Sequence, residues 1–296
     1  MSALEKLSPL LFLLMWSSGA IFVKLGLEDA SVWAFLAVRS VGAALALLTV
    51  CCLYLRHGGL LILKVPWHKI YQACAIGLVL QVCYQTTFFF SLDSGLAPGM
   101  LAIILGLQPL LTSVFARDKV GFIGYAVLLL GLAGLSLAVT GARDIGAITT
   151  LGVIFGLAAV IAITTGSIMQ KSAGIHPVAS AFYQSIAASI VFLALLPFTP
   201  VKLNVTPLFV LSAGWMILVV STSAVLLLFY MLAKGAASKV GVLFYLVPVA
   251  TIVLDYLVFD TPISLMTMAG AVIVLISVTT FNLLLQRDRR KQAPRA

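Results

Sequence analysis

Apolar residues fall into ten long stretches that are separated by short polar connectors. The stretches cover residues 8–27, 31–55, 68–92, 98–116, 120–141, 149–171, 177–197, 207–231, 239–259 and 263–286. Most of them reach the roughly 20 residues with which an α-helix crosses a hydrocarbon layer of about 30 Å. The connectors are too short to form a separate soluble domain. The pattern therefore predicts an all-α, polytopic membrane protein with ten transmembrane helices.

The composition favours the same fold class. Of the 296 residues, 62% are hydrophobic and 9% are charged, whereas a soluble domain is about 45–50% apolar and about 25% charged. These values exclude a water-soluble fold and make the lipid bilayer the predicted environment. The net charge of +9 would favour nucleic acid in a soluble protein. Because most of the cations lie in the connectors, we predict no nucleic-acid partner.

The distribution of the cations predicts the orientation. If the N-terminus is inside, fourteen of the 18 Lys and Arg residues lie in cytoplasmic segments. Only Arg143 and Lys202 lie in outer segments, while Lys24 and Arg39 fall within or at the edge of helices. Cytoplasmic loops of membrane proteins carry an excess of Lys and Arg. Both termini are therefore predicted to be cytoplasmic.

A weak internal repeat divides the chain into halves. At a shift of 139 residues, Pro109 aligns with Pro248 and Gly131 aligns with Gly270. Each half contains five predicted spans, and an odd number inserts the two copies in opposite orientations, as in the inverted repeats of secondary transporters. The alternative is a chance alignment of Leu- and Gly-rich helices. The predicted parts are a first repeat at 1–145, a second, inverted repeat at 146–286 and a basic cytoplasmic tail at 287–296.

The first two stretches carry a recognisable motif. They contain Trp16-Ser17-Ser18-Gly19, a Lys24 that ends the first helix and an Arg39 inside the second. Together with Gln108-Pro109-Leu110 and Leu246-Val247-Pro248, the motif resembles the drug/metabolite transporter superfamily, in its EamA-type ten-helix branch. The resemblance covers about residues 8–286 and is greatest to bacterial amino-acid exporters of the YddG type.

The second repeat departs from this motif. Ile161 and Gln184 stand where the first repeat has Trp16 and Arg39. The resemblance implies a multi-pass carrier in the bacterial inner membrane that exports small metabolites. It implies no cofactor. It leaves the oligomeric state open, and a monomer is compatible with it.

The third stretch contains the clearest candidate for a substrate site. Gln81, Tyr84, Gln85 and Phe88 have the spacing that places residues on one face of a helix. Amides in hydrocarbon are unfavourable unless they face a wet cavity or a hydrogen-bonding partner. Interhelical hydrogen bonding is one interpretation. We favour a cavity wall, because the two rings would offer a stacking surface beside the amides.

Arg39 is the one charged residue deep inside a predicted helix, and intramembrane cations are commonly functional. Two roles fit it: holding a substrate carboxylate, or bracing the carbonyl ends of neighbouring helices. The hydroxyl residues of the sixth and eighth stretches either line the pocket or bond to their own backbone. Pro109 and Pro248 are either hinges or packing kinks. The predicted substrate-binding residues are Trp16, Ser17, Arg39, Gln81, Tyr84, Gln85, Phe88, Gln108, Thr164, Thr165, Ser221, Thr222 and Tyr245.

The sequence lacks the residues that several kinds of chemistry require. His57, His68 and His176 lie in connectors, and no Asp or Glu lies in the middle of a predicted span. There is no His/Cys/Asp cluster at metal-ligand spacing, no Ser–His arrangement at membrane depth and no phosphate loop. We therefore predict neither an enzyme nor a metal site. Without a titrating group in the spans, we predict transport by facilitated diffusion.

The sequence leads to one functional hypothesis and two alternatives. The hypothesis is export of small zwitterionic metabolites, with amino acids (aromatic ones included) as the predicted substrates, by alternating access. The first alternative is a nucleotide-sugar or phosphorylated-metabolite carrier of the same fold, which would need more than one deep cation. The second is a membrane-embedded enzyme or scaffold.

Overall fold

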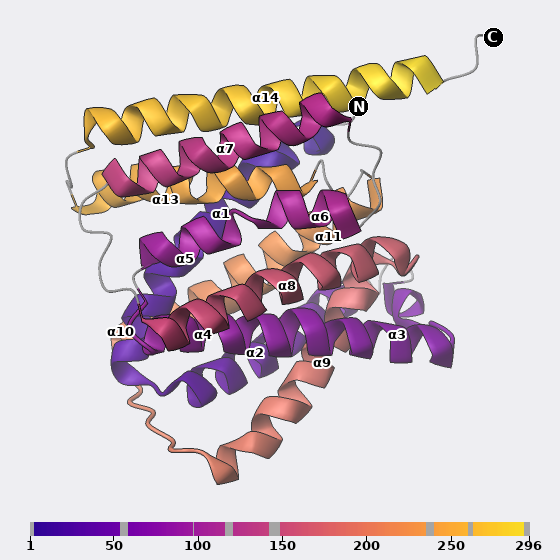
Figure 1. The fold of residues 1–296 in the computed structure, drawn as a ribbon. Coiled ribbons are helices and arrows are strands. Elements are labelled where there is room, and N and C mark those ends of the chain that lie inside the picture. Colours follow the sequence, from indigo (N-terminus) through magenta and orange to yellow (C-terminus); the bar gives the residue numbers. More distant parts are fainter. Residues whose placement is uncertain are drawn as a thin grey trace. The chain divides into compact units, whose positions relative to one another are not determined.

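The structure is a computed structural model, and it describes residues 3–53, 59–96, 98–115, 121–141, 149–234, 240–259 and 263–292. Within these ranges the chain is helical, and its only β contact is an isolated antiparallel bridge between Ala30 and Leu203 (Figure 1). The predicted repeat boundary at residues 145 and 146 lies outside the described residues. The connectors that hold Arg56, Arg117 and Arg143 lie outside them as well.

Eight helical segments of the described chain are long and apolar enough to cross a membrane. They are Leu7–Asp29, Val32–Leu53, Trp67–Asp93, Phe122–Gly141, Thr150–Ser172, Pro177–Phe198, Pro207–Lys234 and Leu265–Leu285. Each corresponds to one of the predicted stretches. The fold is therefore that of a multi-pass membrane protein, in which helices satisfy the backbone hydrogen bonds that lipid cannot.

The other two predicted stretches are interrupted within the described residues. The stretch at 98–116 forms two short helices, α5 (Pro98–Leu105) and α6 (Gln108–Phe115). The stretch at 239–259 forms a 3₁₀ turn, η6 (Val242–Tyr245), followed by α13 (Leu246–Phe259). Each break precedes a proline, Pro109 or Pro248, which has no N–H to continue the hydrogen bonds of an α-helix.

The remaining spans are either continuous α-helices or α-helices with a π-helical segment. The long ones are α1 (Ala3–Asp29), α2 (Val32–Leu53), α7 (Phe122–Gly141), α8 (Thr150–Ser172), α9 (Pro177–Leu195) and α14 (Leu265–Gln292). Two further spans contain π-helical segments. They are composed of α3 (Trp67–Gly77), η3 (Leu78–Cys83) and α4 (Tyr84–Asp93), and of α10 (Pro207–Trp215), η5 (Met216–Ala224) and α11 (Val225–Lys234).

The chain forms two compact units, and each combines segments from both predicted repeats. Unit 1 consists of Met1–Phe90 and Thr165–Lys234, and unit 2 consists of Ser91–Thr164 and Gly235–Ala296. The units are described separately below.

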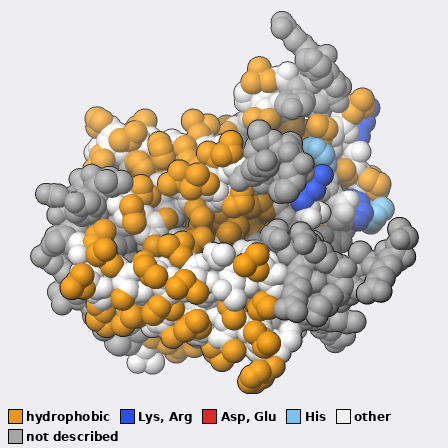
Figure 2. Space-filling view, turned by 90° about the horizontal axis from the view of Figure 1, so that it is seen from above, with side chains coloured by type: hydrophobic (Ala, Val, Ile, Leu, Met, Phe, Trp, Pro, Cys, Tyr) orange, Lys and Arg blue, Asp and Glu red, His pale blue; other side chains and the backbone are white. Residues whose placement is uncertain are grey.

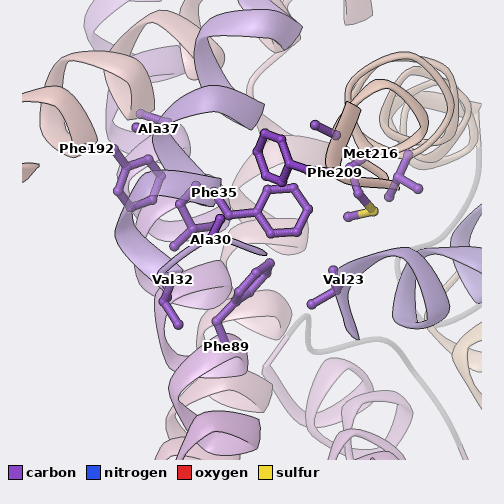
Figure 3. Packing of buried hydrophobic residues seen from close by; sticks show 13 residues of the cluster. Val23, Ala30, Val32, Phe35, Ala37, Phe89, Phe192, Phe209 and Met216 are labelled. Carbon is purple, nitrogen blue, oxygen red and sulfur yellow. The ribbon is translucent and has the colours of Figure 1, made fainter. Parts of the chain in front are cut away.

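Aromatic residues form the core of unit 1. The Phe35 ring of α2 makes edge contacts with Phe89 of α4 and with Phe209 of α10, at centroid distances of 6.0 and 5.7 Å (Figure 3). Val23 and Met216 are buried in the same cluster. Such edge-to-face pairs add about 0.5–1.5 kcal/mol to the burial of the rings. They join helices that are far apart in the sequence.

Glycines permit the tight packing of unit 2. Helices α7 and α14 run side by side (Figure 1). A Cβ atom on Gly134 would lie 2.6 Å from the Ile273 side chain, and one on Gly131 would lie 2.8 Å from the Tyr245 ring. Tyr245 is fully buried in this core and donates a hydrogen bond of 2.9 Å to the carbonyl oxygen of Leu128. Small residues at helix contacts are typical of membrane bundles.

The molecular surface is rich in apolar side chains. Figure 2 shows hydrophobic side chains over much of one face, with Lys, Arg and His gathered at one edge of it. Phe122, Phe198 and Leu265 are among the most exposed large apolar residues, at 89%, 84% and 84%. Apolar exposure on this scale marks a surface that contacts lipid rather than water.

Candidate functional site

The two π-helical segments lie in unit 1, within the spans Trp67–Asp93 and Pro207–Lys234. In η5, Thr222 and Ser223 donate hydrogen bonds to the carbonyl oxygens of Ile217 and Leu218, five residues earlier, at 2.8 and 2.9 Å. Single-turn π segments are rare and frequently occur at functional sites. The sequence analysis did not predict them, because hydrophobic periodicity does not distinguish them from α-helix.

Arg39 of α2 is held by the second π segment. Its Nε donates a hydrogen bond of 2.6 Å to Oγ of Ser221 in η5, and the arginine is only 7% exposed. Helix α2 approaches η5 closely because Gly42 has no side chain, so that Ile217 occupies the place where a Cβ would lie. The contact joins two predicted site residues that are 182 positions apart in the sequence.

Arg39 has no counter-ion in the described part of the chain. The structure shows no other hydrogen bond from its guanidinium there. The sequence explains why no carboxylate is near: the only acidic residues of unit 1 are Glu5, Glu28 and Asp29. Asp29 ends α1 and accepts a hydrogen bond of 2.5 Å from Thr206. A buried cation without a partner is unfavourable, and it attracts an anionic group.

The stripe on the third span lies in the same unit as this cation, and one of its residues interacts with it. Tyr84 lies close enough to Arg39 for the two to interact electrostatically, and it is 9% exposed. Gln81 and Gln85 are equally buried, and Gln85 Nε2 donates a hydrogen bond to Gln81 Oε1. The Phe88 ring lies 5.9 Å from the Tyr84 ring. The amides therefore bond to each other in the described structure, which leaves one amide oxygen and one amide nitrogen of the pair for other partners.

The polar residues of α1 lie in the same unit. Ser17 is buried, Trp16 is half-buried, and the Trp16 ring lies 5.2 Å from Phe12. The neighbouring Ser18 accepts a hydrogen bond of 2.9 Å from the indole nitrogen of Trp215 in α10. Trp215 was not among the predicted site residues, although a tryptophan within the predicted stretch 207–231 is visible in the sequence.

A second polar cluster of unit 1 also lay outside the predicted site. Gln184 Nε2 of α9 donates hydrogen bonds to Gln170 Oε1 of α8 at 2.7 Å and to Ser180 Oγ at 2.9 Å. Ser180 in turn donates to the same Gln170 oxygen at 2.8 Å. Gln184 is fully buried, and its own Oε1 has no hydrogen-bond partner among the described residues. In the sequence, the one indication of this cluster was that Gln184 aligns with Arg39.

The other predicted residues have different surroundings. Thr164 and Thr222 donate to backbone oxygens of their own helices, at 2.6 and 2.8 Å, which is the alternative that the sequence left open for them. Thr165 is half-buried in unit 1. In unit 2, Gln108 is buried, and its Oε1 has no hydrogen-bond partner among the described residues. Tyr245 belongs to the core of unit 2 that is described above.

Among the described residues, no cluster of three or more His, Cys, Asp or Glu side chains could hold a metal ion. The chemistry that the site offers consists of one fixed cation, aromatic faces and neutral hydrogen-bonding groups.

Comparisons with known proteins agree with the transporter resemblance. Residues 150–283 match the EamA-like transporter family. A solved structure, titled only as the crystal structure of a protein, matches 95% of this chain and 97% of its own, with a TM-score of 0.78 and 20% identity. No curated protein matches the chain significantly. The family match supports the drug/metabolite transporter superfamily and a membrane transporter of small molecules, and the solved structure supports the fold.

Proposed function

We propose that the protein is a carrier that exports small zwitterionic metabolites, amino acids including aromatic ones, by alternating access. The observation that carries the proposal is the buried Arg39, which interacts with Tyr84 and has no counter-ion among the described residues. A guanidinium matches the planar geometry of a carboxylate. Aromatic rings add a stacking surface for the substrate side chain.

The positions of the irregular segments support an inverted repeat. The two π segments begin at Leu78 and Met216, which are 138 residues apart. The break at Gly106-Leu107 and the 3₁₀ turn that ends at Tyr245 have nearly the same separation. These separations match the shift of 139 that the sequence indicated. Inverted repeats with discontinuous helices are the usual basis of alternating access.

Facilitated diffusion is the proposed energetics. A proton-coupled carrier needs a group that titrates inside its transport pathway. Between Ala30 and Leu92, and again between Thr165 and Lys234, the sequence has no Asp or Glu. Arginine stays protonated and does not relay protons. Substrate would therefore leave the cell down its own concentration gradient.

Transport by the purified protein in proteoliposomes tests the proposal. The panel contains all twenty amino acids, and vesicles without protein are the control. We expect saturable flux of several neutral amino acids, aromatic ones among them, that a pH step does not drive uphill. Absence of flux for every amino acid would overturn the proposed function. Uphill accumulation that follows the pH step and disappears with an ionophore would overturn the proposed energetics.

The proposed orientation has a separate test. A reporter fused after Arg295 and a cysteine placed at Lys69 should both be cytoplasmic in the bacterial inner membrane. Labelling of the Lys69→Cys variant by an impermeant maleimide from outside intact cells would contradict the orientation.

A further inference from the structure

We propose that the site recognises its ligand through the carboxylate alone, so that it also accepts small aromatic monocarboxylates that lack an amino group. Arg39 is the anchor of that carboxylate. The inference rests on the proposed function and extends its substrate class beyond amino acids.

The hydrogen bonding of Arg39 leaves one edge of the guanidinium for a ligand. Nε is occupied by Ser221, at 2.6 Å. The two terminal nitrogens have no partner in the described part of the chain, and together they present parallel N–H donors. A carboxylate binds such a pair through both of its oxygens. Ser221 is therefore a positioning residue: it fixes the plane of the guanidinium without contacting the ligand.

The segments of unit 1 that contain Arg39 and Ser221 offer no comparable group for an ammonium. The sequence has no Asp or Glu between Ala30 and Phe90 or between Thr165 and Lys234, and Glu28 and Asp29 lie at the end of α1. The neutral groups known to interact with Arg39 are Ser221 and Tyr84. A ligand ammonium would meet only neutral acceptors there, whereas the carboxylate pairs with a full opposite charge through two parallel N–H donors. Loss of the amine therefore weakens binding far less than loss of the carboxylate.

The second polar cluster limits the ligand to one negative charge. Gln184 aligns with Arg39 in the sequence but is neutral, fully buried and bonded to Gln170 and Ser180. Among the described side chains of unit 1, Arg39 is therefore the one buried cation. A dicarboxylate or a phosphate monoester would leave a second charge unpaired, which is costly in a desolvated site.

Four ligands with the same ring separate these contributions. They are L-phenylalanine, 3-phenylpropionate (no amine), phenethylamine (no carboxylate) and L-phenylalaninamide (carboxylate neutralised). Each competes with labelled phenylalanine for the purified protein, at a pH of about 6.5 that keeps the acids ionised and the amines protonated. We expect 3-phenylpropionate to compete within about tenfold of phenylalanine, and the two cations to be at least about thirtyfold weaker. Competition by phenethylamine but not by 3-phenylpropionate would overturn the inference.

Variants test whether Arg39 causes the preference for carboxylate ligands over amine ligands. In Arg39→Gln the ranking of acid over amine should disappear, and in Arg39→Lys it should persist with weaker binding. Ser221→Ala should weaken the carboxylate ligands about three- to tenfold, and Ser221→Thr should restore them. Ser223→Ala is the matched control, because that hydroxyl bonds to its own backbone. Should Arg39→Gln not yield a monodisperse protein, Ser221→Ala carries the test.

The inference and the proposed function fail in different ways. If wild-type protein transports no amino acid, the proposed function is wrong. If it transports phenylalanine but does not bind 3-phenylpropionate, only the inference is wrong. Equal acid preference in Arg39→Gln and wild type would likewise overturn the inference while leaving the transport function intact.

Discussion

Unit 1 contains two buried polar clusters that differ in how completely they are satisfied. In the first, Arg39 carries a full charge and makes one hydrogen bond to a described residue, Ser221. In the second, Gln184, Gln170 and Ser180 form a closed triangle of hydrogen bonds without any charge. Hydrogen bonds among neutral buried groups stabilise a particular packing, although Gln184 Oε1 has no partner among the described residues. A buried charge that is left without a counter-ion lowers stability and is therefore the better candidate for function.

The comparison predicts opposite consequences for the two clusters. Changes at the Arg39 cluster should reduce transport and leave stability intact, whereas changes at the Gln184 cluster should reduce stability and leave transport intact. The largest effect is expected for Arg39→Met. Transport of amino acids should fall about a hundredfold, which corresponds to about 2.7 kcal/mol. The melting temperature should stay the same or rise, because an apolar side chain replaces an unpaired buried charge.

Flux in proteoliposomes and thermal unfolding in detergent measure the two effects of Arg39→Met. Arg39→Lys, which keeps the charge, is the control and should lose less transport. A variant that unfolds at a much lower temperature and loses transport in proportion would instead identify Arg39 as a brace between helices.

The next largest effect concerns the backbone contact beneath the Gln184 cluster. A Cβ atom on Gly77 of α3 would lie 2.7 Å from Cα of Gln184, so α3 and α9 would have to separate. Overpacking of this kind costs about 1–3 kcal/mol. Gly77→Ala should therefore lower the melting temperature while transport per folded molecule changes little. Gly214→Ala is the control, because nothing lies within 4 Å of its added Cβ. Equal melting temperatures for the two variants would contradict the close contact.

The membrane spans could be predicted from the sequence because lipid exposure imposes long apolar stretches. Eight predicted stretches correspond to spans by length and composition. The two that do not are interrupted near Pro109 and Pro248, which the sequence marked as kinks or hinges. The π segments could not be predicted, since hydrogen bonds to the fifth preceding residue leave no pattern in the hydropathy.

Part of the candidate site followed from helical spacing alone. Gln81 and Gln85 are four residues apart on one face, and the structure joins their amides. The contact between Arg39 and Ser221 did not follow, because it links residues 182 positions apart and depends on tertiary packing. The cluster around Gln184 was missed for the same reason, since the turn between α8 and α9 brings it together.

Gln184→Met tests the second polar cluster directly, and we expect it to have a smaller effect than Gly77→Ala. The variant removes the hydrogen bonds to Gln170 and Ser180, and it also removes an amide oxygen that has no partner among the described residues. A net loss of about 1 kcal/mol of stability follows, since a typical hydrogen bond contributes about 0.5–1.5 kcal/mol. Amino-acid flux, normalised to folded protein, should stay within about twofold of wild type. A loss of flux at unchanged stability would place Gln184 in the transport pathway instead.

The smallest effect is expected at the aromatic side of the Arg39 cluster. Tyr84 lies beside Arg39 and its ring contacts Phe88, so that Tyr84→Ala removes one stacking face without removing the charge. Aromatic contacts contribute about 0.5–1.5 kcal/mol beyond burial, and a fall of about fivefold in affinity follows for phenylalanine relative to alanine or threonine. Tyr84→Phe keeps the ring and should keep this ratio. The ratio of the two flux rates is the measurement, because it cancels differences in protein yield. If Tyr84→Ala and Tyr84→Phe give the same ratio as wild type, the ring does not contact the substrate, and selectivity for aromatic substrates must come from another surface.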